Sequence, residues 1–176
     1  MTMNLNCMNN TVQNVDGNIW YNNQIIFKKI SNTFVFRYGS SLFIIRKRIN
    51  ILHAFLPDLA SKYLIYDYYA EPWTWHGFRA GDPHGNSGRC IGYFKTHAKN
   101  KKLKIYLKSA SRKISEELDF EHFFVSSRQE FNIGPTRYHF QNKAIHLEKE
   151  GNTDELDFLI SSFILWHCAY GNNVGN

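Results

Sequence analysis

The stretch "TDELDFLISSFILWHCAY", residues 153–170, predicts the architecture of this protein most directly. Thr153 is a typical helix N-cap, two acidic residues follow it in what would be the first turn, and Gly171 stands where a helix would end. Placed at about 100° per residue, the apolar side chains cover every side of this helix, whereas a surface helix keeps a polar stripe. The segment is shorter than the roughly 20 residues that span a bilayer. We therefore expect a helix that the rest of the protein encloses.

The chain before this helix has the character of a β-protein. Short segments rich in Ile, Phe, Val and Tyr alternate with Asn, Ser and Gly, which is typical of β-hairpins. The clearest strands are residues 33–39, 62–69 and 101–108, and residues 136–150 predict a hairpin. Residues 115–124, "SEELDFEHFF", instead predict a short helix, because a serine can cap it and two acids follow. The fold class is therefore a β-rich α+β domain, with an antiparallel β-barrel or strongly curved sheet enclosing the hydrophobic C-terminal helix.

The chain of 176 residues has the length of one domain. Residues 1–17 are polar and Asn-rich, do not have the pattern of a secretory signal, and predict a disordered arm. Residues 18–171 would form the β-rich domain and residues 172–176 a flexible tail. The three cysteines lie far apart without a CxxC motif, which indicates a reducing compartment and a cytoplasmic protein. No apolar run approaches about 18 residues, so we expect no transmembrane segment. The sequence does not indicate an oligomeric state.

A helix inside a β-barrel resembles the tubby-like barrel superfamily, which includes the phospholipid scramblases and the LURP-type proteins. The resemblance rests on residues 154–170, on "KYLIYDYY" at 62–69, and on "CIGYFKTHAKNKKLKIYL" at 90–107, a strand pair that contains a glycine. It covers about half of the chain and implies binding to lipids or action on membranes. The chain departs from the family in its long segment 69–90, in the helix predicted at 115–125, and in the absence of a scramblase-type acidic calcium segment.

Positive charge is concentrated in one part of the chain. The formal net charge is +6, and residues 95–113 carry eight Lys and Arg and no acid. If residues 101–108 form a strand, Leu and Ile would face the core while most of the lysines face solvent. A rigid array of ammonium groups attracts phosphate groups. The predicted ligand-binding residues are Lys95, Lys99, Lys101, Lys102, Lys104, Tyr106 and Lys108, with Arg46, Lys47 and Arg48 if the hairpins stack beside them.

We therefore expect a non-enzymatic protein that binds acidic phospholipid headgroups and needs neither a cofactor nor a metal ion. Binding to the headgroups would bring the protein to the membrane surface. Nucleic acid fits the same charges, because Tyr106 among the lysines could stack on a base. A strand face of solvated lysines that prevents edge pairing would need no ligand. A protein partner, as for an immunity or adaptor protein, would leave no motif and stays open as a further alternative.

The stretch "EPWTWHGFRAGDPHGNSGRC", residues 71–90, suggests an enzyme by its residue types. Histidine is the usual acid–base residue near neutral pH, and a histidine pair with a lysine could cleave a phosphodiester. However, the glycine spacing matches neither a P-loop nor a dinucleotide fingerprint, and no GxSxG is present. Its aromatic residues more simply anchor a loop or form a binding tip. The residues of this enzymatic alternative would be His76, Asp82, His84 and His97.

The sequence does not predict a metal site. There is no HExxH motif and no Cys-His zinc spacing. His139 and His146 are separated by an odd number of positions, so on one regular strand they would face opposite sides. We therefore expect that they do not share a metal ion.

Overall fold

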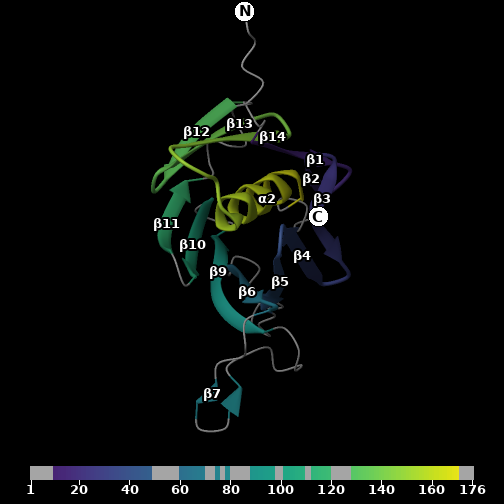
Figure 1. The fold of residues 1–176 in the computed structure, drawn as a ribbon, viewed down its shortest axis with the longest axis vertical. Coiled ribbons are helices and arrows are strands. Elements are labelled where there is room, and N and C mark those ends of the chain that lie inside the picture. The colour runs from purple at the N-terminus through teal and green to yellow at the C-terminus, as the bar shows by residue number, and fades with distance from the viewer. Residues whose placement is uncertain are drawn as a thin grey trace, which may run out of the picture.

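The computed structural model describes residues 10–48, 60–69, 74–75, 78–79, 88–97, 101–109, 112–119 and 128–170, with the backbone alone at 74–75 and 78–79. A twelve-stranded antiparallel sheet curves into a nearly closed barrel around helix α2, Glu155–Tyr170 (Figure 1). This arrangement confirms the predicted β-rich fold with an enclosed C-terminal helix. No helix within the described ranges is long and apolar enough to cross a membrane.

The order of the strands around the barrel follows their order in the chain, except that two short strands, residues 74–75 and 78–79, are left out of the barrel. They are β1 (Thr11–Val15), β2 (Asn18–Tyr21), β3 (Gln24–Ile30), β4 (Thr33–Tyr38), β5 (Ser41–Arg48), β6 (Ser61–Asp67), β9 (Arg89–His97), β10 (Lys102–Lys108), β11 (Lys113–Asp119), β12 (Arg128–Ile133), β13 (Thr136–Gln141) and β14 (Ala144–Lys149). Their order in the sheet is β11-β10-β9-β6-β5-β4-β3-β2-β1-β14-β13-β12. Strands β7 (Thr74–Trp75) and β8 (Phe78–Arg79) pair separately, so β9 lies directly against β6.

Two predicted features of the chain were wrong. Residues 115–119 belong to strand β11 and not to a helix, because β11 pairs with β10 along its whole length, from Lys102↔Asp119 to Lys108↔Lys113. The capping pattern was a local signal, and cross-strand pairing overrides such signals. The expected disordered arm, residues 1–17, contains strand β1, which is paired on both sides, with β2 and β14. Residues 1–9 and 120–127 lie outside the described residues.

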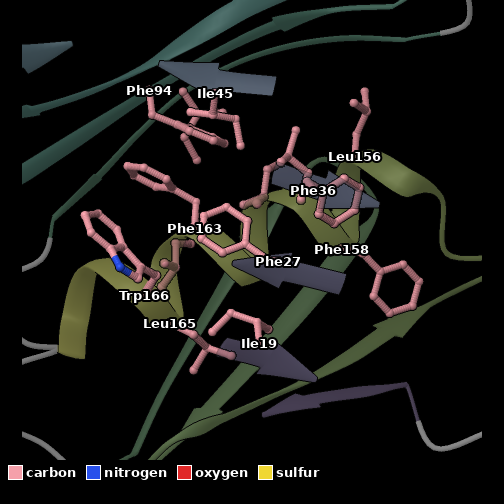
Figure 2. Packing of buried hydrophobic residues seen from close by; sticks show 14 of the residues in the cluster. Ile19, Phe27, Phe36, Ile45, Phe94, Leu156, Phe158, Phe163, Leu165 and Trp166 are labelled. Carbon is pink, nitrogen blue, oxygen red and sulfur yellow. The ribbon is translucent and has the colours of Figure 1, made fainter. Parts of the chain in front are cut away.

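Helix α2 fills the barrel because its apolar side chains point in all directions. Every residue from 156 to 166 is buried. Phe163 stacks on Phe94 of β9 with ring centroids 4.2 Å apart (Figure 2). The centroid of the Trp166 ring lies 4.4 Å from that of the Phe34 ring. Burying one such side chain contributes about 1.5–3 kcal/mol. The helix therefore forms the centre of the core, and truncating Phe163 to Ala would cost about 3–5 kcal/mol.

The helix begins one residue later than the capping pattern suggests. The carboxylate of Asp154, not the Thr153 hydroxyl, accepts the backbone N–H groups of Leu156 and Asp157, at 3.1 Å each. Asp154 is therefore the N-cap, a role that carboxylate, amide and hydroxyl side chains fill about equally well.

Gly92 allows β9 to bend between its two neighbours. A Cβ atom at this position would lie 1.9 Å from the backbone carbonyl oxygen of Tyr106 on β10. The pairing of β6 with β9 shifts register next to this glycine, and β9 is visibly curved in Figure 1. Glycine is therefore required by the close approach of the two backbones.

Candidate functional site

Four basic residues lie side by side across four neighbouring strands. Lys104 of β10 is opposite Lys95 of β9, Lys95 is opposite Lys62 of β6, and Lys62 is opposite Arg48 of β5. We call these four residues the outer row. Adjacent strands lie about 4.8 Å apart, so the row extends over roughly 14 Å of the sheet.

The outer row faces away from helix α2. Side chains alternate between the two faces of a strand, and the strand neighbours of the row are buried in the core. Leu103, Phe94 and Tyr63, each next to a row residue in the chain, are 0%, 0% and 6% exposed. The row residues themselves are half-buried or exposed. The row therefore lies on the outside of the barrel.

Lys62 is the member of the row that sequence reasoning missed. The sequence predicts a strand at residues 62–69 but does not indicate that its first lysine belongs to the basic surface. The Lys62 Nζ lies 4.1 Å from the ring centroid of Tyr93, and Tyr93 stacks on Tyr106 with centroids 5.5 Å apart. The alternation of "KYLIYDYY" could have placed Lys62 on the outer face, but not beside Lys95, which depends on strand order.

The predicted residues of β5 divide between the two faces of the sheet. Ile45, the residue before Arg46, is buried in the core, so the alternating residues Arg46 and Arg48 share the outer face. Lys47 has the opposite orientation and lines a cavity inside one end of the barrel, together with Tyr63 and Trp166. The Arg-Lys-Arg sequence therefore contributes to two separate places.

The lysines of β10 are partly neutralised by strand β11. The Glu117 carboxylate lies 2.9 Å from the Nζ of Lys102 and 3.3 Å from that of Lys104. The hydrogen bond with Lys102 lowers the pKa of Glu117 and raises that of Lys102. In contrast, no ion pair of Lys62, Lys95 or Arg48 is found within the described parts of the chain. Among the described residues, Lys62, Lys95 and Arg48 therefore carry the positive charge of the row that lacks a carboxylate partner.

The remaining predicted ligand residues lie near the row or beyond the described chain. Lys101 is exposed in the turn that precedes β10, and Lys108 lies opposite Lys113 at the far end of the strand. Lys99 lies outside the described residues. Arg112, also within the basic segment 95–113, points into the protein instead and pairs with Asp154, the N-cap of α2, and with Asp157 in its first turn.

His97 is the one residue of the enzymatic alternative that the structure describes. It ends β9 opposite Lys102. Burial, followed by the charges of Lys95 and Lys104, lowers the pKa of His97. This shift favours the neutral imidazole. His76, Asp82 and His84 lie outside the described residues, so the hypothesis of a histidine pair stays a prediction.

The expectation that His139 and His146 face opposite sides was wrong. They are direct cross-strand partners of β13 and β14, with ring centroids 6.0 Å apart. The rule of alternation holds along one strand, but the turn between these residues reverses the chain. His139 contacts Glu130 at 3.1 Å and Glu148 at 3.0 Å. Nevertheless, the described residues contain no group of three or more ligands that could hold a metal ion.

A buried ionic cluster holds the N-terminal end of α2. Asp157 is 0% exposed and accepts hydrogen bonds from Thr136 Oγ1 at 2.9 Å and Tyr138 Oη at 3.2 Å. It also pairs with Arg112 at 2.8 Å and Lys149 at 2.9 Å. Burial by itself would raise the pKa of Asp157, but the hydrogen bonds from Lys149 and Arg112 outweigh it and lower the pKa. This cluster serves the fold, because all its charges face one another.

The fold and the outer row together define a β-barrel protein with an enclosed C-terminal helix and basic residues aligned across its outer face. Comparisons with models of protein families, with curated proteins and with solved structures find no match to this chain. The resemblance to the tubby-like superfamily therefore stays a prediction, and a function has to be argued from the chemistry of the residues.

Proposed function

We propose that this protein binds negatively charged membrane surfaces, with acidic phospholipid headgroups contacting the outer row. The alignment of like charges carries the proposal. Residues directly opposite on antiparallel strands have Cβ atoms about 4.5–5.5 Å apart, and like charges at that spacing destabilise a sheet. Lys62 has a basic residue on both sides, Lys95 and Arg48. Phosphate groups bound between these side chains would neutralise their mutual repulsion. An alignment that is unfavourable for the fold by itself therefore favours the binding of an anionic ligand.

The shape of the row supports a surface as the ligand. The strands hold the four residues in line on the outside of the barrel, so several phosphate groups can be contacted at once. Each lysine or arginine near an acidic membrane contributes about 1 kcal/mol, and the contributions add over a row. This interaction is electrostatic and therefore weakens as salt screens it.

Nucleic acid is the weaker alternative because the aromatic rings are already in contact with protein groups. Tyr106 stacks on Tyr93, Lys62 covers Tyr93, and the Lys113 Nζ lies 5.9 Å from the Tyr106 ring centroid. A base that stacked on Tyr106 would have to displace such contacts. Headgroup phosphates would contact only the ammonium and guanidinium groups. Their binding would therefore leave the stacked rings in place.

Co-sedimentation with vesicles tests the proposal. We expect the protein to sediment with vesicles of phosphatidylcholine and phosphatidylserine, and not with phosphatidylcholine alone, and to be released at about 0.5 M salt. The double substitution Lys62→Glu and Lys95→Glu should weaken binding at least about thirtyfold, because two contributions of about 1 kcal/mol are lost. Lys102→Glu with Lys104→Glu should have a smaller effect, since Glu117 already neutralises part of their charge.

The matched control is Lys28→Glu with Lys143→Glu, which changes the net charge equally at exposed positions of β3 and of the β13–β14 turn. It should retain most of the binding. Equal sedimentation with both kinds of vesicle, or an equal loss in the control variant, would refute the assignment of the outer row. Binding to a single-stranded oligonucleotide without binding to vesicles would favour the nucleic-acid alternative.

A further inference from the structure

A second candidate site lies inside the barrel, on the opposite face of the sheet from the outer row. A cavity of about 470 Å³ opens at the C-terminal end of α2, and small-molecule sites typically measure about 300–1,000 Å³. Turns, strands and the helix all contribute to its wall. The lining residues are Asp16, Gly17, Asn18, Lys29, Asn32, Phe34, Lys47, Tyr63, Trp166 and Tyr170.

Four aromatic residues line the cavity, and the rings of three of them contact one another. Phe34 and Trp166 meet edge to face with centroids 4.4 Å apart, and Tyr63 lies edge-on to both, at 6.1 Å from Phe34 and 6.2 Å from Trp166. Because these three rings meet edge to face, their faces do not stack on one another. Burial also raises the pKa of Tyr63, as expected in an apolar environment. All three residues are largely buried, and the parts of their rings that line the cavity are where a flat apolar group can pack.

Two lysines point toward the same space from strands on either side of β4. Lys29 on β3 is opposite Phe34, and Lys47 on β5 is opposite Tyr63 of β6. The Lys29 Nζ lies 5.9 Å from the centroid of the Phe34 ring. Strands β3 and β5 are two strand spacings apart, about 10 Å, which flexible lysine side chains can bridge from both sides.

The charges in the cavity favour an anion. No ion pair of Lys29 or Lys47 occurs in the portion of the chain that the structure describes, whereas Lys149 and Arg112 at the other end of α2 are paired. Asp16 is the one acid among the lining residues and is outnumbered by the two lysines. A neutral ligand would leave both ammonium groups without a counter-charge in a partly enclosed space.

We propose that this cavity binds a small amphipathic anion: a carboxylate or sulfonate that carries a flat aromatic group. The aromatic part packs against Phe34, Tyr63 and Trp166, while Lys29 and Lys47 hold the anionic group. This site is independent of the outer row, because Lys62 and Tyr63 are neighbours in the chain that face opposite sides of the sheet.

A matched pair of fluorescent probes tests the site in the full-length protein. 8-Anilinonaphthalene-1-sulfonate and N-phenyl-1-naphthylamine have the same aromatic body, and only the first carries an anionic group. We expect saturable binding of one sulfonate per chain, at least about tenfold tighter than that of the neutral probe, as for one hydrogen bond to a charged group. Energy transfer from tryptophan to the bound probe should fall in Trp166→Phe.

Substitutions of the lysines separate a specific site from general hydrophobic binding. Lys29→Gln and Lys47→Gln should each weaken binding of the sulfonate about tenfold and leave the neutral probe within about twofold. Lys28→Gln is the control, since Lys28 precedes Lys29 but is not among the lining residues.

Three results would overturn this proposal: no saturable binding, equal affinity for both probes, or equal effects of Lys28→Gln and Lys29→Gln. The vesicle assay keeps the two proposals distinguishable. Lys29→Gln with Lys47→Gln should still sediment with acidic vesicles, and Lys62→Glu with Lys95→Glu should still bind the sulfonate.

Discussion

The two ends of helix α2 are held in opposite ways. At the N-terminal end, Asp157 is fully buried and bonds to Thr136, Tyr138, Arg112 and Lys149, so every charge of this cluster has a partner. At the C-terminal end, aromatic rings surround a cavity, and its two lysines lack carboxylate partners among the described residues. The charged end therefore contributes to the stability of the fold, and the aromatic end retains groups that can bind a ligand.

This division follows from the composition of the helix. Apolar contacts are not directional, and a helix that is apolar on all sides has no preferred rotation inside a barrel. Hydrogen bonds to Asp157 are directional and come from β13, from β14 and from the residue before β11. We infer that the ionic cluster determines the position and rotation of α2, and thereby where Trp166 lies relative to the lysines of the sheet.

The largest effect is expected from Asp157→Ala. Removing this carboxylate takes away the buried partner of Arg112 and Lys149 and leaves them only the half-buried Asp154. Removing one partner of a buried pair typically costs about 3–5 kcal/mol. The free energy of unfolding, measured in urea, should fall by that amount. Glu155→Ala is the control in the same turn and should cost less than about 1 kcal/mol. Similar losses for both variants would show that the cluster does not hold the helix.

The same carboxylate predicts a dependence of stability on pH. The pKa of Asp157 is lowered in the folded protein from the usual 3.8. The folded state therefore binds this proton less readily than the unfolded state, and Asp157 stabilises the protein fully above about pH 4. The contribution is lost as the pH falls through the lowered pKa. The difference in Tm between the wild type and Asp157→Asn should shrink below about pH 4; a constant difference would contradict the assignment.

Two neighbouring serines in the middle of α2 predict a smaller effect. The Ser162 hydroxyl is buried and lacks a hydrogen-bond partner within the described structure, whereas Ser161 donates to the carbonyl oxygen of Asp157 at 3.0 Å. The free energy of unfolding of Ser162→Ala should therefore exceed that of Ser161→Ala by about 1 kcal/mol. The reason is that only the substitution of Ser162 removes an unsatisfied polar group. Urea unfolding of both variants measures this difference, and equal values would refute it.

An effect smaller than that of Asp157→Ala is expected at the open end. Tyr170 is 38% exposed, and its Oη lies 3.3 Å from where a Cβ on Gly17 would be. Tyr170→Ala should cost about 1–2 kcal/mol of stability, less than Asp157→Ala, since more than a third of the residue is already exposed. A loss comparable to that of Asp157→Ala would mean that the C-terminal end also holds the helix, and would remove the contrast between the two ends.

Much of the fold could be predicted because its signals are local. The absence of a polar stripe in residues 153–170 indicated an enclosed helix, and alternation predicted the strand at 101–108. The helix expected at 115–124 was wrong because a serine followed by acids is compatible with a strand when a basic strand lies beside it. Glu117 pairs with Lys102 and Lys104, and the residues near Glu117 in the chain do not predict that pairing.

The candidate sites were less predictable because they depend on strand order. The residue types alone were sufficient to indicate a barrel, a buried helix and an excess of positive charge near residues 95–108. Only the tertiary structure places β6 between β5 and β9, which brings Lys62 beside Lys95 and turns Lys47 inward. Periodicity along the chain decides which face a residue occupies, whereas its neighbours across the sheet are decided by which distant strands pair.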